Sequence, residues 1–296
     1  MSINARAVRI REHGGPEVLE VGETRVRDAG AGEIRVAVAA AGLNRADTLQ
    51  RRGLYPAPPG VDPHVPGLEF AGEVDQLGPG VTEWKLGDRV MGIVPGAGMA
   101  THVVTPAREA LWVPRSLSLT EAAAVPEAFL TAFDALFELG GLRQGELALI
   151  HAVASGVGTA AIQLCRVAGA RSAGTSRTAD KLAPCQALGL DHVLHTPDGR
   201  FAAELERLTG GGADVILDTV GAAYLSENVR ALAMRGRLVV IGLLGGAKAE
   251  FPLGALLPKR ARVEGSVLRS RAPEEKAALA QSFSKHILAG FDTGAY

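Results

Sequence analysis

The stretch Ala148-Leu149-Ile150-His151-Ala152-Val153-Ala154-Ser155-Gly156-Val157-Gly158 decides the fold of this chain. It runs from an apolar strand, through small residues, into an apolar helix predicted over Val157–Ala168. Such a turn lets a diphosphate approach the backbone N–H groups of a helix N-terminus, where the helix dipole favours negative charge. The strict G-x-G-x-x-G spacing is absent, but small residues can meet the same steric demand. The turn therefore predicts a dinucleotide site with the contacts Ala152, Ser155, Gly156, Val157 and Gly158.

From about residue 120 onward, strands and helices alternate around this turn. The predicted strands are Leu147–His151, Arg171–Thr175, Val193–His195, Asp214–Asp218 and Arg237–Ile241. This alternation indicates a doubly wound parallel sheet with right-handed crossovers, the Rossmann arrangement. One helix is predicted before the first of these strands, over Thr120–Gly140.

Before residue 120 the pattern is that of short strands separated by Gly- and Pro-rich turns. The predicted strands are Glu33–Ala40, Leu68–Val74, Asp88–Val94 and Thr101–Thr105. Many short strands with dense turns are typical of a compact, barrel-like β domain. We therefore expect an α/β protein with a β domain over residues 1–122, a Rossmann domain over 123–270 and a C-terminal helical segment over 271–296.

Composition excludes several classes of partner. The 296 residues are 47% hydrophobic and 21% charged, with a net charge of −1, so no overall field attracts nucleic acid or an anionic membrane. No run approaches the roughly 18 apolar residues that a spanning helix needs. The two cysteines are too few for a disulfide framework, which favours a reducing, cytoplasmic setting.

The end of the second Rossmann strand bears on the choice of cofactor. An NAD site usually places Asp or Glu about 20 residues beyond the glycine turn, where it holds the ribose hydroxyls. Here that place holds Ser176 and Arg177, with Lys181 shortly after, so a hydroxyl and two cations replace the carboxylate. These residues favour NADPH, whose 2′-phosphate they could bind. The alternative is that Arg177 and Lys181 are solvated residues at a helix start.

Three motifs resemble one known family. They are Gly42-Leu43-Asn44-Arg45-Ala46-Asp47, Pro66-Gly67-Leu68-Glu69-Phe70-Ala71-Gly72 and Ser155-Gly156-Val157-Gly158-Thr159-Ala160. In this order the chain resembles the zeta-crystallin-like, zinc-independent quinone oxidoreductases of the medium-chain dehydrogenase/reductase superfamily, over nearly its whole length. The resemblance implies a GroES-like N-terminal β domain, an NADPH-binding Rossmann domain and a homodimer formed through Rossmann edge strands, here Ala261–Val267.

The resemblance also implies further cofactor contacts. Thr131 resembles a contact on the nicotinamide side. Gly242, Leu243 and Leu244 follow a Rossmann strand, where the carboxamide would be read, and Ser266 and Leu268 come next along that edge. Chains of this family normally continue beyond Tyr296 and return a last strand to the β domain, so we expect the C-terminal segment to be a truncated return.

Zinc alcohol dehydrogenases, which are relatives of this family, differ at two decisive positions. They carry a cysteine where this chain has Asn44, and a histidine where it has Leu68. Leucine cannot bind a metal, and an Asn carbonyl is a poor substitute for a thiolate. We therefore expect no metal site.

Without a metal, hydrogen-bond donors must stabilise the charge that develops on a hydride acceptor. Asn44 and Tyr55 are the candidate donors, and Asp47 is the residue that orients its neighbours. The alternative for Asn44 is a turn residue that closes Gly42–Asp47, and the alternative for Tyr55 is an aromatic ring packed against prolines.

The resemblance implies that the chain transfers a hydride from NADPH to a quinone. One alternative is a double-bond reductase of alkenals, enones or enoyl thioesters, for which Arg51-Arg52 or Arg269 and Arg271 could form a basic groove for the acyl carrier. The second alternative is a crystallin-type protein that binds NADPH without catalysis. The sequence does not choose between a quinone and an enone as the small-molecule partner.

Overall fold

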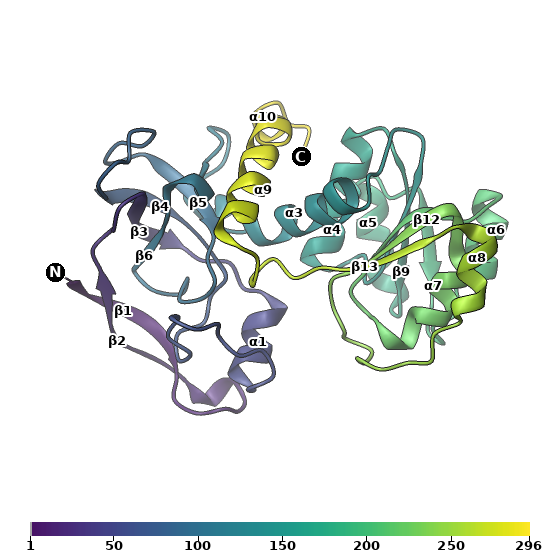
Figure 1. Cartoon of the computed structure of the whole chain (residues 1–296), viewed down its shortest axis with the longest axis horizontal. Helices are drawn as coiled ribbons and strands as arrows, with labels where there is room; N and C mark the ends of the chain where they lie inside the picture. The colour runs from purple at the N-terminus through teal and green to yellow at the C-terminus, as the bar shows by residue number, and fades with distance from the viewer. Residues whose placement is uncertain (1) are drawn as a thin grey trace. The chain divides into compact units, whose positions relative to one another are not determined.

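A computed structural model describes residues 2–296 of the chain (Figure 1). These residues divide into two units. The first contains the chain up to Leu130 together with Leu268–Gly294, and the second contains Thr131–Val267 with Ala295–Tyr296. The structure thus divides inside helix α3 (Pro126–Phe133), whereas the sequence predicted a boundary at residue 122. No helix among the described residues is long and apolar enough to cross a membrane.

The first unit is built on antiparallel sheets. Strands β1 (Ser2–Ile10) and β2 (Leu19–Arg27) form a two-stranded sheet. A five-stranded sheet has the order β6-β3-β4-β5-β7. Its strands are β3 (Glu33–Ala40), β4 (Glu69–Leu77), β5 (Arg89–Ile93), β6 (His102–Pro106) and β7 (Leu111–Trp112). The sequence predicted β3 to β6 within a few residues, but it missed β2, whose alternation is hard to see because none of its side chains is fully buried.

The apolar faces of the five-stranded sheet form the core of the first unit. Ile34, Val36, Phe70 and Val90 are completely buried there. They come from the three neighbouring strands β3, β4 and β5, so one buried cluster joins the centre of the sheet. This rigid sheet supports the segments that leave the ends of β3 and β4.

Short helices connect and cover these strands. They are η1 (Pro16–Val18), α1 (Arg45–Arg51), η2 (Ala107–Glu109), α2 (Leu119–Ala122), α9 (Pro273–His286) and α10 (Leu288–Asp292). The C-terminal segment belongs to this unit because α9 packs against η2 and β7, and the Ser116 hydroxyl donates to the Phe291 carbonyl oxygen. The prediction of a single helix over Thr120–Gly140 is wrong. It is divided into α2, α3 and a π-helical turn η3 (Asp134–Leu139), because Pro126 cannot continue a helix and instead begins α3.

The second unit is a parallel sheet with the order β10-β9-β8-β11-β12-β13 (Figure 1). The strands are β8 (Leu147–Ile150), β9 (Arg171–Ser176), β10 (His192–His195), β11 (Ala213–Asp218), β12 (Leu232–Val240) and β13 (Arg262–Gly265). The order reverses between β8 and β11, which is where doubly wound sheets bind their ligands. The predicted α/β class with a doubly wound sheet is confirmed.

Helices connect the parallel strands. They are α4 (Gly156–Val167), η4 (Ala179–Lys181), α5 (Leu182–Ala187), α6 (Ala202–Thr209), η5 (Ala222–Tyr224), α7 (Leu225–Ala231), η6 (Leu253–Ala255) and α8 (Leu256–Lys259). Strand β12 begins at Leu232, earlier than the predicted Arg237. Its first residues pair irregularly with β11, and Arg235 has a φ of 60°, so the alternation that marks a strand is broken there.

A chain of buried polar side chains links three elements of this unit. The His151 ring bonds the Thr175 hydroxyl through Nδ1 (2.9 Å) and the Asn228 side chain through Nε2. Asn228 in turn donates to the carboxylate of Asp218 at 3.0 Å. Burial lowers the pKa of His151 to about 4, so the ring is neutral. His151 is therefore a structural hydrogen-bonding residue, as its position at the end of a buried strand predicted.

Candidate functional site

The predicted dinucleotide turn joins β8 to α4 in the second unit. Ser155 caps the helix, because its hydroxyl accepts a hydrogen bond from the Gly158 amide at 3.2 Å. The backbone N–H groups of Gly156 and Val157, the two residues directly after Ser155, have no hydrogen-bond acceptor among the described residues. Two free N–H groups at the positive end of a twelve-residue helix form a site that fits a diphosphate.

Small residues are required at two points of this turn. Ala152 has a φ of 48°, a left-handed conformation that a side chain tolerates poorly. A Cβ atom on Gly158 would lie 2.3 Å from the carbonyl oxygen of Val153, so only glycine lets α4 pack this close to the turn. The geometry of this turn thus depends on a small residue at 152 and on glycine at 158.

A second loop lies at the same carboxyl edge of the sheet. Gly242, Leu243 and Leu244 follow β12, and the Leu244 amide donates to the carbonyl oxygen of Thr219 at the end of neighbouring β11. Both leucine side chains are exposed. The structure therefore brings this predicted segment to the edge that also carries the β8–α4 turn.

The end of β9 carries the residues predicted to choose the cofactor. Ser176 closes a local turn, because its hydroxyl donates to the Thr178 carbonyl oxygen at 2.9 Å and accepts from the Thr178 amide at 3.1 Å. Arg177 and Lys181 are exposed, and neither side chain has an ion-pair partner among the described residues. The end of β9 itself thus carries no carboxylate, and the segment after it offers two cations with the exposed Asp180 between them in sequence.

The remaining predicted cofactor contacts lie in both units, Thr131 and Ser266 in the second and Leu268 in the first. Thr131 is the partly exposed first residue of the second unit. The Ser266 hydroxyl donates to Asp134 Oδ2 at 3.1 Å, and Leu268 is a buried residue of the first unit. Their contact with a cofactor stays a prediction.

In the first unit, Asn44 is tied to a buried glutamate. Its side-chain Nδ2 donates to Glu69 Oε1 at 2.7 Å. The other oxygen of Glu69 accepts from the backbone amide of Glu127 at 2.8 Å, at the start of α3. Gly42 leaves the room that this arrangement needs, because a Cβ atom there would lie 2.0 Å from Glu69 Oε1. The position that carries a metal-binding cysteine in zinc enzymes here holds one end of a hydrogen-bond chain.

Asp47 holds the segment around Asn44 in place. Its two carboxylate oxygens accept from the backbone amides of Asn44 (2.8 Å) and Gly67 (2.9 Å). Asn44 is thereby the N-cap of α1, a helix that the turn interpretation of Gly42–Asp47 did not include. Asp47 thus holds the backbone of Asn44 and Gly67, and its predicted part in the active site stays a prediction.

Tyr55 lies under a guanidinium group. The Arg269 Cζ atom is 4.6 Å from the centre of the Tyr55 ring, a cation–π contact. Arg269 is fixed by donation to the carbonyl oxygens of Pro95 (2.6 Å) and Pro56 (3.2 Å) and to Gln50 Oε1 (3.0 Å). The ring therefore has one defined environment, and packing against prolines alone does not account for its position.

The electrostatics of this cluster are dominated by burial of acidic groups. Burial raises the pKa of Glu69 to about 7, against its hydrogen bonds from Glu127 and Asn44. Burial, followed by the charges of Glu69 and Asp47, raises the pKa of Glu127 to about 8, while Arg269 opposes the shift. Burial also raises the pKa of Asp47 and that of Tyr55. Acidic groups with pKa values near neutrality are suited to proton transfer.

Sequence reasoning missed two members of this cluster. Glu69 was quoted as part of a motif without a role, and Glu127 was not singled out. Glu127 follows Pro126 at a helix start, where an acidic residue is ordinary, so nothing in the local pattern distinguishes it. Only the fold, which brings β4 and α3 together, shows that two glutamates share one site.

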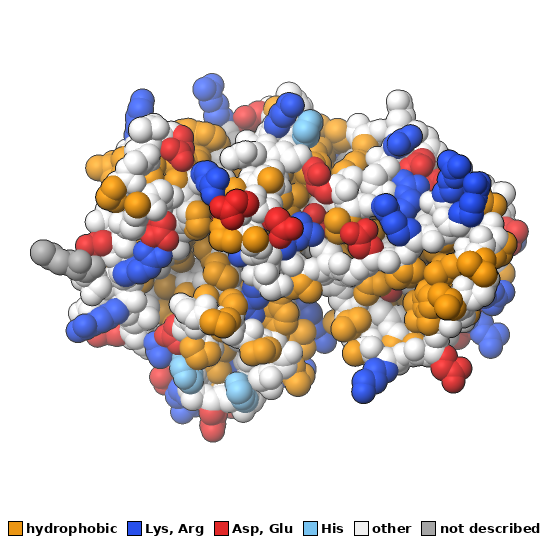
Figure 2. Space-filling view, in the orientation of Figure 1, with side chains coloured by type: hydrophobic (Ala, Val, Ile, Leu, Met, Phe, Trp, Pro, Cys, Tyr) orange, Lys and Arg blue, Asp and Glu red, His pale blue; other side chains and the backbone are white. Residues whose placement is uncertain are grey.

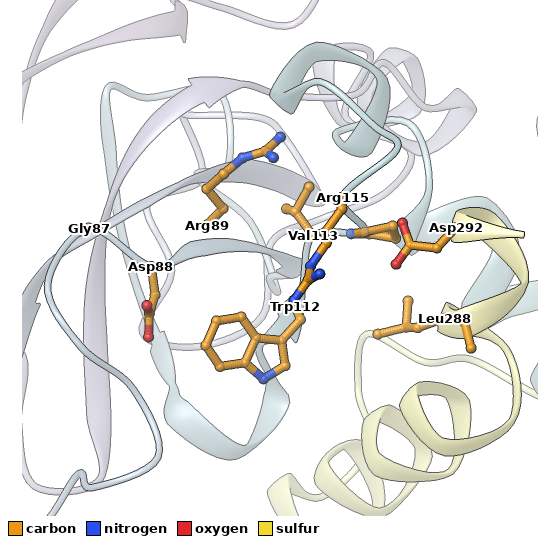
Figure 3. A pocket seen from close by; sticks show the side chains of 10 residues that line it. Gly87, Asp88, Arg89, Trp112, Val113, Arg115, Leu288 and Asp292 are labelled. Carbon is orange, nitrogen blue, oxygen red and sulfur yellow. The ribbon is translucent and has the colours of Figure 1, made fainter.

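The first unit also has a surface pocket away from this cluster (Figure 3). It is lined by Gly87, Asp88, Arg89, Trp112, Val113, Pro114, Arg115, Leu288, Ala289 and Asp292. None of the predicted site residues lines it. Among residues 2–296, no three His, Cys, Asp or Glu side chains are grouped so that they could hold a metal ion.

The family of the chain follows from comparison with known proteins. An "Alcohol dehydrogenase GroES-like domain" family matches residues 30–115, and a "Zinc-binding dehydrogenase" family matches residues 156–285. The quinone oxidoreductase-like protein 2 homolog of Nematostella vectensis is 34% identical over 284 residues, which are 95% of this chain and 77% of that protein. The chain belongs to the medium-chain dehydrogenase/reductase superfamily.

Other members of the superfamily are similar to this chain. The quinone oxidoreductase of Pseudomonas syringae pv. Tomato DC3000 has a TM-score of 0.87 at 31% identity, over 98% of this chain and 89% of that structure. The JamJ enoyl reductase has the same TM-score, 0.87, at 26% identity, over 99% and 89%. The phthioceranic/hydroxyphthioceranic acid synthase of Mycobacterium tuberculosis is 39% identical over 236 residues, 79% of this chain. The chain spans only 11% of that synthase. The superfamily binds a nicotinamide cofactor, and the fold, with its GroES-like and Rossmann units, agrees with the predicted class.

The Glu69 bridge gives a prediction about stability. Replacing Glu69 by Ala leaves the Asn44 amide and the Glu127 N–H without their acceptor, so we expect the free energy of unfolding to fall by about 2 kcal/mol. Urea denaturation at pH 6 would measure it. The control is Glu73→Ala, an exposed position on the same strand, which should change stability by less than about 0.5 kcal/mol. Equal effects of the two substitutions would contradict a structural role for the bridge.

Proposed function

We propose that this chain transfers a hydride from NADPH to a quinone. The observation that carries the proposal is the turn before α4, where the free amides of Gly156 and Val157 lie beside a strand end that carries Arg177 and no carboxylate. Quinone oxidoreductases of known structure and the sea-anemone relative, which is named for its likeness to them, support the choice of acceptor.

The residues of the chain would bind and orient the reactants. A nicotinamide cofactor supplies the hydride when bound. The α4 turn would hold its diphosphate, and the loop Gly242–Leu244 would read its carboxamide. In the first unit, Tyr55 and the second N–H of the Asn44 amide would donate to the oxygen that gains charge, with Asn44 held by Glu69 and Asp47. Hydride transfer then needs little beyond orientation and exclusion of water.

The alternative of a double-bond reductase is supported by the similarity to enoyl reductases. For an acyl carrier it would use a basic groove, and two of the arginines suggested for that groove are engaged otherwise. Arg51 is buried and donates to the Gly14 carbonyl oxygen, and Arg269 is held by three hydrogen bonds. The quinone proposal is therefore preferred over enoyl thioesters.

The acceptor is tested by steady-state oxidation of NADPH. We expect the highest kcat/KM with ortho- or para-quinones, lower values with alkenals and enones, and the lowest with enoyl thioesters. A preference for enoyl thioesters would replace the proposed function by the double-bond reductase. Tight NADPH binding without oxidation by any acceptor would favour the crystallin-type alternative.

The cofactor preference is tested by removing the two cations. The double substitution Arg177→Ala, Lys181→Ala should raise the Kd of NADPH by about tenfold to 100-fold, because charged hydrogen bonds to the 2′-phosphate are lost, and should leave the Kd of NADH unchanged. Fluorescence titration measures both. Arg207→Ala, on exposed α6, is the control. Tighter binding of NADH than of NADPH by the unaltered protein would refute the preference.

We also propose a homodimer that forms through β13 of the second unit, in a cytoplasmic protein. β13 pairs with β12 on one side, and exposed apolar side chains gather around neighbouring α8 (Figure 2), among them Leu257 of α8 and Leu253 of the preceding η6, with 77% and 66% of their surface exposed. Val263→Asp places a charge on the strand and should convert the dimer to a monomer in light scattering after gel filtration. Val21→Asp, on exposed β2, should leave it dimeric. A monomeric unaltered protein would refute the proposal.

A further inference from the structure

The buried Glu69 and the half-buried Glu127 of the first unit differ in the donors that surround them. Glu69 accepts a hydrogen bond at each oxygen, from the Asn44 amide and from the Glu127 backbone N–H. The carboxyl group of Glu127 has no hydrogen-bond or ion-pair partner among the described residues. Hydrogen-bond donors stabilise a carboxylate more than a carboxylic acid, so this arrangement favours the negative charge on Glu69 and the proton on Glu127.

The surroundings of Glu127 favour the same distribution. Asp47 from α1 and Glu69 from β4 face it with negative charge, and Arg269 from the C-terminal segment is the one cation that opposes them. Burial raises the pKa of Asp47, and its two backbone hydrogen bonds oppose that shift. These groups together raise the pKa of Glu127 to about 8, with burial as the largest cause. Two interacting carboxyl groups then share one proton near neutral pH.

The Glu127 carboxyl is not completely enclosed by protein. Every fully buried side-chain nitrogen or oxygen among the described residues has a hydrogen-bond partner. The carboxyl oxygens of Glu127 have none, so they are not fully enclosed, and the residue is half-buried although protein atoms crowd around its carboxyl group. Tyr55 belongs to the same neighbourhood, because the charge of Glu127 acts on its phenol group.

From this arrangement we propose that the carboxyl group of Glu127 holds the proton that is transferred to the acceptor along with the hydride. Glu69 accepts the hydrogen bonds of both nearby donors, and this favours the proton on Glu127. The proposal rests on the proposed function. A quinone that accepts a hydride, which is one proton and two electrons, becomes a hydroquinone anion. The O–H bond of Glu127 then breaks, a new O–H bond forms on the hydroquinone oxygen, and no further electrons move. Water returns a proton to Glu127, and Tyr55 and Asn44 act as hydrogen-bonding, positioning residues.

The proton itself is tested without any turnover. In protein labelled with 13C at the glutamate carboxyl carbons, we expect one signal that titrates near pH 8 and disappears in Glu127→Gln. In Glu69→Gln the Glu127 signal should titrate at lower pH, because the neighbouring negative charge is gone. If Glu127 titrates near its ordinary value of about 4.3, the proposal is overturned, whatever the protein reduces.

The pH profile tests the transfer. With the unaltered protein kcat for a quinone should fall as pH rises through about 8, because the acid form is lost. Glu127→Gln should lower kcat on the order of 100-fold, remove this limb of the profile and leave the Kd of NADPH unchanged. Glu127→Asp should restore part of kcat together with a basic limb. Glu73→Gln, exposed on β4, should behave like the unaltered protein.

The outcomes separate the two proposals. A Glu127→Gln variant that folds, as judged by its melting temperature, and keeps both kcat and the basic limb would refute the role of Glu127 while the proposed function stands. An unaltered protein that oxidises NADPH with none of the acceptors refutes the proposed function and with it the transfer step. The carboxyl titration then still decides whether Glu127 holds a proton at neutral pH.

Discussion

The buried carboxylate of Glu69 is the constraint on which the first unit's site depends. It receives the Asn44 side chain on one oxygen and the first turn of α3 on the other. A buried charge is costly unless donors surround it, so these two segments must keep their positions for the carboxylate to be tolerated. The Glu69 side chain on β4 thereby holds the Asn44 side chain and the backbone at the start of α3, which come from different parts of the chain. In zinc enzymes a metal ion performs this task.

The second unit uses a different device, the free end of a helix. The amides of Gly156 and Val157 can remain without acceptors because they face solvent, and Gly158 lets α4 begin close to Val153. The buried chain of Thr175, His151 and Asn228 joins the ends of β9 and β8 to helix α7. Because each of its polar atoms is satisfied only in one arrangement, it holds the strand ends at a fixed spacing under the loops.

The second unit could be predicted from sequence more completely than the first. The alternation of its strands and helices and the small residues before α4 are local features of the sequence. They predicted the start of α4 to within one residue. In the first unit Asn44 and Asp47 were found, but as a turn and not as the start of a helix. Glu127 was not found at all, because its role depends on contact with Glu69, which is distant in sequence, and no local pattern encodes that contact.

The charge of the first unit's cluster bears on what can react there. Glu69 and Asp47 act on Glu127 with negative charge, and Arg269 opposes them with a smaller effect. When Glu69 is ionised, the local field is therefore negative while Glu127, whose pKa is higher, keeps its proton. Such a field raises the energy of an anionic acceptor and of the anion formed by hydride transfer, so a proton must be at hand. A neutral acceptor with an oxygen that can be protonated, such as a quinone, meets both conditions better than a phosphate-bearing thioester does.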